Sequence, residues 1–96
     1  MNSSEQVPLD LSELLRIAAT SGIVSPPVVV KTFNVTFPFA AEALRTLAEM
    51  QYIEILPESG IVPTYRVTPD GYATVEAQRG KKGMLGKLIA PALVTL

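Results

Sequence analysis

The chain has 96 residues, of which 48% are hydrophobic and 18% charged, and this composition indicates one small folded domain rather than a disordered segment. It contains no cysteine and no histidine, which excludes disulfides and thiolate metal sites and removes the most common general base. The formal charge of −1 hides an asymmetry, because residues 1–78 hold four bases and all nine acids, while residues 79–96 hold four bases and no acid. We therefore expect an acidic folded body and a basic tail.

Neither a targeting segment nor a membrane span is predicted. The N-terminal residues lack a basic region followed by an apolar run, and the apolar stretches fall short of the roughly 18 residues that a span needs. We therefore expect a cytoplasmic protein. The carboxylates are scattered rather than paired, and the segment Gly80–Lys87 has the wrong spacing for a phosphate-binding loop, with Leu88 in place of Ser or Thr. We expect no enzyme, no metal site and no cofactor.

The chain begins with residues 1–9, which we expect to form a flexible N-terminus. A first helix is predicted over Asp10–Thr20, where apolar residues repeat at spacings of three and four. Asp10 suits the N-cap, and Gly22 suits the left-handed position that often follows a helix. A very short strand at Ile23-Val24 is a further expectation.

A second, short helix is predicted over Pro26–Phe33. Ser25 suits its N-cap, and Pro26 suits a first helical position, where a missing N–H costs nothing. Three consecutive valines make a strand the alternative, but the Ser-Pro-Pro entry and the Asn34 exit favour a helix held by packing rather than by propensity.

Asn34 suits a tight turn, since asparagine tolerates the left-handed backbone conformation better than most residues. Val35 is then expected to be buried in the turn and Thr36 to cap a third helix that runs to about Met50. The predicted core stripe of that helix is Ala40, Leu44 and Leu47.

Two strands and a fourth helix follow. The strands are predicted at Tyr52–Leu56 and Thr64–Val67, as an antiparallel pair joined by a loop over Pro57–Pro63. Thr68 suits the N-cap of a helix over Pro69–Gln78. Residues 79–96 form a basic and then apolar C-terminal tail.

Two stretches carry a family resemblance: FNVT at residues 33–36 with the helix after it, and YRVTPDG at residues 65–71. In this order and spacing they resemble the winged helix-turn-helix transcription regulators, in the broad style of the MarR and PadR families. The resemblance covers about residues 11–78. It implies an α+β, mostly α fold: a winged helix-turn-helix domain over residues 10–78 with a two- to three-stranded antiparallel wing. Gln51 stands where these families usually have glycine, which leaves open how that turn closes.

The function that the resemblance implies is binding of double-stranded DNA in transcription regulation, and the small size would suit a regulator from a phage or other mobile element. The departure is chemical: the expected outward face of the third helix has one arginine, one acid and two phenylalanines, whereas base reading favours Arg, Lys, Asn or Gln. Arg45 could equally be a solvated residue that pairs with Glu42 or Glu49. The candidate DNA-binding residues are Ser25, Lys31, Thr36, Phe37, Phe39, Ala41, Glu42, Arg45, Arg66, Arg79, Lys81 and Lys82.

The alternative function is a protein-protein interaction module that binds a partner through Phe37 and Phe39. Either ring could instead complete the core, and we expect this more for Phe37 than for Phe39. Regulators of the resembled type usually dimerise through their termini, so a homodimer through the apolar tail is expected, unless the tail folds back on its own domain. The candidate tail residues are Leu85, Leu88, Ile89 and Leu93.

Overall fold

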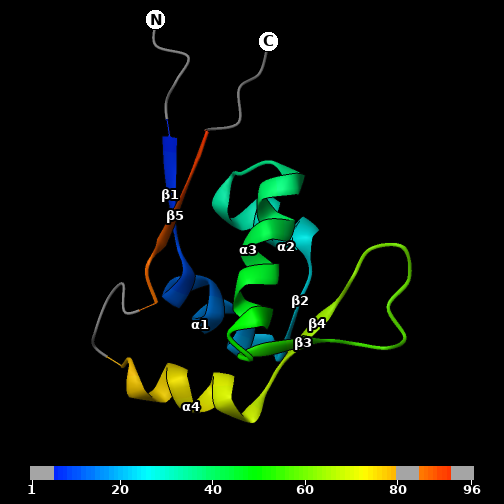
Figure 1. Ribbon diagram of the computed structural model, residues 1–96, viewed down its shortest axis with the longest axis vertical. Helices are drawn as coiled ribbons and strands as arrows, with labels where there is room; N and C mark the ends of the chain where they lie inside the picture. The colour runs from blue at the N-terminus through cyan, green and yellow to red at the C-terminus, as the bar shows by residue number, and fades with distance from the viewer. Residues whose placement is uncertain (1–5, 80–84, 92–96) are drawn as a thin grey trace, which may run out of the picture.

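The computed structural model describes residues 6–79 and 85–91 of the chain. In chain order these residues form β1 (Gln6–Asp10), α1 (Leu11–Ser21), β2 (Ile23–Val24), α2 (Pro26–Phe33), α3 (Phe37–Glu49), β3 (Ile53–Ile55), β4 (Tyr65–Val67), α4 (Pro69–Ala77) and β5 (Lys87–Pro91). Figure 1 shows α3 at the centre, α4 across the base and the β3–β4 hairpin extending to one side. The α+β, mostly α class predicted from the sequence is confirmed. None of the described helices is long and apolar enough to cross a membrane.

The helix ends lie where the capping residues predict them. The Asp10 carboxylate accepts the Ser12 N–H at 2.9 Å, and Gly22 adopts φ +85° while its N–H donates to the Ala18 carbonyl at 2.8 Å. The side chain of Thr68 likewise accepts the Gly71 N–H at 3.0 Å at the start of α4. These short-range contacts close each helix end, which is why single residues in the sequence were sufficient to predict the boundaries.

The residues Pro26–Phe33 form a helix, as predicted, rather than a strand. Val29 is fully buried and α2 packs against α3, so burial offsets the weak helix propensity of three consecutive valines. The expected strand at Ile23-Val24 is β2. It pairs with β4, which also pairs with β3, and the result is an antiparallel three-stranded sheet of order β2-β4-β3. The predicted wing is therefore present.

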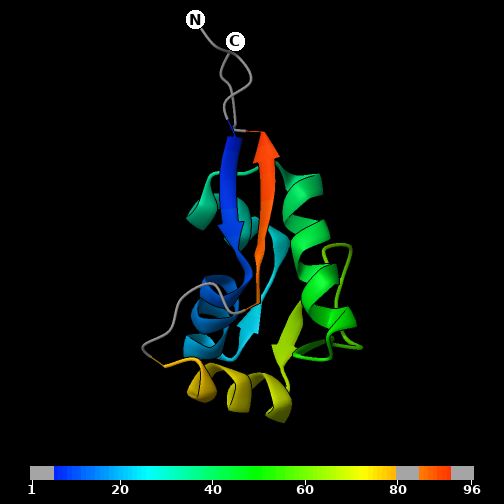
Figure 2. The same ribbon diagram turned by 60° about the vertical axis from the view of Figure 1, so that its left-hand side comes forward.

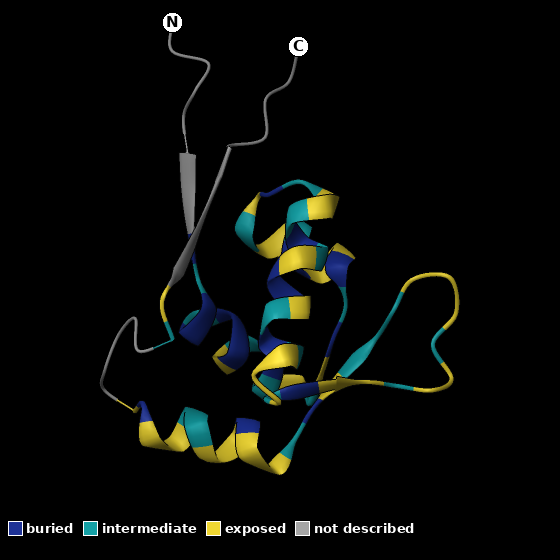
Figure 3. Cartoon of the chain, viewed as in Figure 1, coloured by how far each residue is buried: buried dark blue, intermediate teal, exposed yellow. Residues whose placement is uncertain are grey.

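The core lies between α1, α2, α3 and the three-stranded sheet, where Figure 3 shows the buried residues facing one another. The predicted stripe of Ala40, Leu44 and Leu47 is fully buried, together with Ala43 and the turn residue Val35. Gly71 lets α4 approach this body closely. A Cβ at that position would lie 2.2 Å from the Tyr52 carbonyl oxygen, so a side chain there would force the helix away from the sheet.

A second sheet, not predicted from the sequence, joins the two ends of the described chain. β1 pairs antiparallel with β5, with Gln6 opposite Pro91 and Asp10 opposite Lys87. Figures 1 and 2 show this pair of strands extending away from α1. The predicted flexible N-terminus covers residues 1–9 and the predicted basic and apolar tail covers residues 79–96, and no strand was expected in either. In the structure β1 begins at Gln6 and β5 spans Lys87–Pro91. Residues so far apart in sequence leave no local signal of their pairing, and a proline in each strand weakens the strand pattern.

Candidate nucleic-acid interface

The helix-turn-helix unit is fixed by the turn between α2 and α3. Asn34 adopts the predicted left-handed conformation, with φ 58°, and its N–H donates to the Val30 carbonyl at 2.9 Å. Thr36 is extended, and its carbonyl accepts the Ala40 N–H at 2.9 Å. Ser25 and Thr36 hold the predicted cap positions, but within the described part of the chain neither hydroxyl caps its helix. The hydroxyls of Ser25 and Thr36 therefore take no part in helix capping.

The outward side of α3 carries a charged cluster of three residues. Arg45 donates to both carboxylate oxygens of Glu42, at 2.7 and 2.6 Å, and to Glu49 at 3.0 Å. The hydrogen bond that Arg45 donates to Glu42, followed by the negative charges of Glu42 and Glu49, raises the pKa of the Arg45 guanidinium above its usual value. This three-residue group, called the Arg45 cluster below, carries a net negative charge. The pairing of Arg45 with acids on its own helix, which the sequence left as an alternative to DNA contact, is present.

Pairing with acids extends to the other arginines. Arg66 on β4 contacts Glu54 on β3, Arg79 contacts Glu76 at 3.3 Å, and Arg16 contacts Glu13. Each of the four arginines of the chain therefore has a carboxylate neighbour, and all five ion pairs are solvent-exposed. Lys31, by contrast, is exposed on the last turn of α2 and has no ion pair within the described residues.

The two phenylalanines at the start of α3 point in different directions. Phe37 is 46% exposed, whereas Phe39 is partly buried and packs against the core. The expectation that Phe37 would be the more buried of the two is wrong. Helical periodicity gives the angle of a residue around the axis, but it does not say how far along the axis the covering elements reach. Ala41 is half-buried and Glu42 exposed, so the outward surface consists of Phe37 at one end and the Arg45 cluster farther along.

The wing is short of charge and rich in apolar surface. Its loop is closed by the Leu56 N–H, which donates to the Thr64 carbonyl at 2.8 Å, and by the Ser59 hydroxyl, which donates to that carbonyl at 3.1 Å and accepts the Thr64 N–H at 2.9 Å. Ile61 is fully exposed and Val62 is 39% exposed. These two residues, the apolar wing tip, were not among the predicted site residues. Their position in a loop between Gly60 and Pro63 could have identified them.

The chain matches no protein-family model and no curated protein, but it does match solved structures. A MepR-like protein complexed with pseudoligands superposes with a TM-score of 0.67 over 77% of this chain and 54% of that one, at 17% sequence identity. A cysteine-to-serine mutant of MarR from E. coli complexed with operator DNA superposes with a TM-score of 0.64 over 73% of this chain and 51% of that one, at 18% sequence identity. The fold is a winged helix-turn-helix. The chain spans about half the length of these structures.

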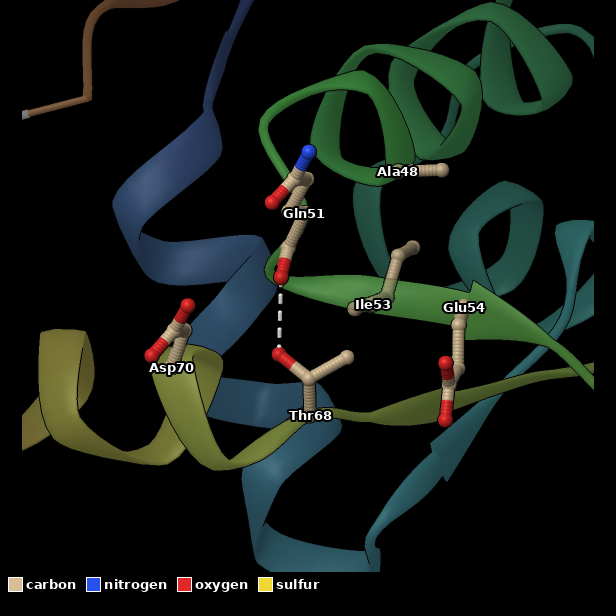
Figure 4. A pocket seen from close by; sticks show the side chains of 6 residues that line it. All are labelled: Ala48, Gln51, Ile53, Glu54, Thr68 and Asp70. Atoms are coloured by element: carbon tan, nitrogen blue, oxygen red, sulfur yellow. Dashed lines mark hydrogen bonds between the residues drawn. The ribbon is translucent and has the colours of Figure 1, made fainter.

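The winged helix also holds a pocket of about 320 Å³ between the end of α3, β3 and the start of α4. Figure 4 shows its lining, and the dashed line marks the Thr68 hydroxyl donating to the Gln51 carbonyl at 2.8 Å. Gln51 adopts φ 69°, so the turn after α3 closes in the left-handed conformation although glycine is absent. Among the described residues, no group of three or more acids is placed to hold a metal ion. The lining residues are Ala48, Gln51, Ile53, Glu54, Thr68 and Asp70.

The predicted tail residues fall into three groups. Leu85 is partly buried against the winged-helix core, and its N–H donates to the Ser12 hydroxyl at 2.9 Å. Leu88 and Ile89 belong to β5. Lys81, Lys82 and Leu93 lie outside the described residues. The tail therefore returns to its own domain at Leu85 before it pairs with β1.

Proposed function

We propose that this chain is a DNA-binding protein that uses its winged helix in transcription regulation. The observation that carries the proposal is the exposed outward side of α3, a helix that follows a tight turn after α2 in a fold shared with a MarR mutant complexed with operator DNA. The dimensions of an α-helix fit the major groove, and the first residues of α3 and the outward Arg45 would face the bases and phosphates.

The charges on the outward surface of α2 and α3 make each proposed contact with DNA weak, and they make the binding sensitive to salt. Lys31 and Arg45 are the cations on α2 and α3, and Arg45 is shared with Glu42 and Glu49. Approaching phosphates would compete with these carboxylates for the guanidinium and would repel them. We therefore propose that Lys31 and Arg45 make phosphate contacts, and that Glu42 and Glu49 limit the affinity.

The test is a duplex-DNA shift assay at two salt concentrations. The affinity should fall with added salt, and Arg45→Ala should lower the slope of log affinity against log salt by about 1. The double variant Glu42→Gln/Glu49→Gln should raise the affinity several-fold at low salt. The matched control is Glu76→Gln, which removes a carboxylate from an Arg79 pair on α4 and should have a smaller effect for each charge. Absent or salt-independent binding at low ionic strength contradicts the proposal.

A second candidate function, docking to a protein partner, is favoured by Phe37. Phe37 is 46% exposed at the first position of α3, and aromatic side chains of this kind often anchor protein interfaces. In this case Phe37→Asp should abolish partner capture and leave the melting temperature nearly unchanged, while Arg45→Ala should retain the partner. Phe39→Asp serves as the structural control, because that ring packs against the core and its loss should lower the melting temperature.

A further inference from the structure

The outward side of α3 changes in character along the helix. Phe37, Ala41 and Arg45 follow one another at intervals of four residues, so they lie near one line along the helix surface. Pro38 and Glu42 stand on the neighbouring line, and both are exposed. The outward side therefore begins with the ring of Phe37, a proline and the methyl group of Ala41, and it continues into the Arg45 cluster.

The apolar start of this side has little capacity to read bases by hydrogen bonds. Glu42 is the nearest charged side chain, and both of its carboxylate oxygens accept from Arg45, at 2.7 and 2.6 Å. To accept a hydrogen bond from a cytosine amino group, this carboxylate would have to give up a charged partner. The hydroxyl of Thr36 can both donate and accept, so it distinguishes poorly between bases. Sequence preference at this end of α3 must come from the apolar groups.

The major groove presents one group that an apolar surface can read, which is the C5 methyl group of thymine. The other distinctive groups on the base edges are hydrogen-bond donors and acceptors. Phenylalanine and alanine side chains are suited to contact with that methyl group, because the contact removes apolar surface on both sides from water. An outward face that starts with Phe37 and Ala41 can therefore distinguish A·T from G·C pairs without hydrogen bonds.

The spacing of Phe37 and Arg45 fits a single groove. Arg45 stands eight residues after Phe37, and a helix rises about 1.5 Å per residue, so the two lie about 12 Å apart along the axis. The major groove is also about 12 Å wide. The first turn of α3 is at the end of the helix away from β3 and α4 (Figure 1). With this turn against the base edges, Arg45 would lie near the phosphates at the rim of the groove.

We propose that Phe37 is the specificity-determining residue of this interface and packs against thymine methyl groups in the major groove, with Ala41 beside it. The inference rests on the proposed DNA binding and names the base that the site prefers. Lys31 and Arg45 supply affinity through phosphates without sequence preference, whereas the ring of Phe37 supplies the preference for A·T pairs. Phe39 has no part in it, because that ring packs against the core.

The test compares duplexes that differ only in the methyl group. Random-sequence duplexes are made with thymine in one pool and deoxyuridine in the other, so charge, base pairing and hydrogen-bonding groups are the same. The native protein should bind the thymine pool more tightly, by about fourfold for each methyl group that it removes from water. Both affinities should fall with added salt, but their ratio should stay constant, because an apolar contact displaces no counterions. A third pool, with deoxyuridine and 5-methylcytosine, should recover affinity.

Variants on α3 assign the preference to the ring. Phe37→Ala should abolish the difference between the thymine and deoxyuridine pools, while Phe37→Leu, which keeps an apolar side chain, should retain part of it. Arg45→Ala is the matched control from the same line of the helix. It should weaken binding to both pools by the same factor and leave their ratio unchanged. The melting temperature of Phe37→Ala should stay near the native value, because the ring is 46% exposed.

The outcomes separate this inference from the function on which it rests. Equal affinity for the thymine and deoxyuridine pools, with binding that still falls with salt, overturns the inference and leaves the proposed function standing; the exposed ring then belongs to the protein-docking candidate. A ratio that survives Phe37→Ala overturns it as well. If Phe37→Ala lowers the melting temperature, the 5-methylcytosine pool decides, since it needs only the native protein and no gain there contradicts the inference. Absence of binding to every pool contradicts the proposed function itself.

Discussion

The inward and outward sides of α3 are built from neighbouring residues and satisfy different requirements. On the inward side Ala40, Leu44 and Leu47 are fully buried against α1, α2 and the sheet. On the outward side Arg45 is held by Glu42 and Glu49 of the same helix. The inward side depends on the rest of the chain, whereas the outward charges are satisfied within one helix. The fold therefore places few demands on the outward side, and its residues are free to serve binding.

The largest expected effect is a difference in stability between substitutions at two adjacent residues, one on the inward side of α3 and one on its outward side. Leu44→Ala should lower the free energy of unfolding by about 2–5 kcal/mol, because it removes a fully buried side chain and leaves a cavity. Arg45→Ala should lower it by less than about 1 kcal/mol, since exposed ion pairs contribute little. Urea denaturation of both variants measures the difference. Similar losses for the two would mean that the Arg45 cluster stabilises the fold, and the contrast between the sides would fail.

The next largest effect concerns the backbone geometry of the turns before and after α3. Gln51 holds φ 69° and Asn34 holds φ 58°, both in the left-handed region. Gln51→Gly should raise the free energy of unfolding by up to about 1 kcal/mol, because glycine adopts this conformation without the penalty that a side chain carries. Asn34→Gly should change it less, since asparagine tolerates the region better. Thermal melts of both variants would show the order, and a destabilised Gln51→Gly would contradict the strain argument.

How much of the fold could be predicted from the sequence depends on how far apart in the chain the contacting residues lie. Asn34 and Thr68 act through backbone atoms three or four residues away, so single residues predicted the turn and the start of α4. The core stripe of α3 was equally local, because it depends on helical periodicity. The sheet of β1 and β5 joins residues near opposite ends of the chain, and nothing local in either strand points to the other. Its absence from the sequence prediction is thus a consequence of long-range pairing.

The candidate site divides in the same way. The pairing of Arg45 with Glu42 and Glu49 was foreseeable, since the three residues are three and four apart on one helix. The pairing of Arg66 with Glu54 depends on the β3–β4 register, which could be predicted only approximately from the sequence. The order of burial of Phe37 and Phe39 was predicted wrongly, because it depends on which other elements reach the start of α3. Contacts between elements thus remained open, while contacts within one element were predicted.

The smallest expected effect tests whether apolar residues of the wing also divide into buried ones that stabilise the fold and exposed ones that do not. Ile53 is 1% exposed in β3, whereas Ile61 is fully exposed in the wing tip. Ile61→Ser should leave the free energy of unfolding within about 0.5 kcal/mol of the native value, because the side chain is already in water. A urea denaturation curve measures this, with Ile53→Ala as the destabilised control. The DNA shift assay then gives the variant a second use. A loss of affinity without a loss of stability would mean that the wing contacts DNA through apolar surface rather than through phosphate neutralisation. Unchanged affinity would confine the proposed DNA contacts to α2 and α3.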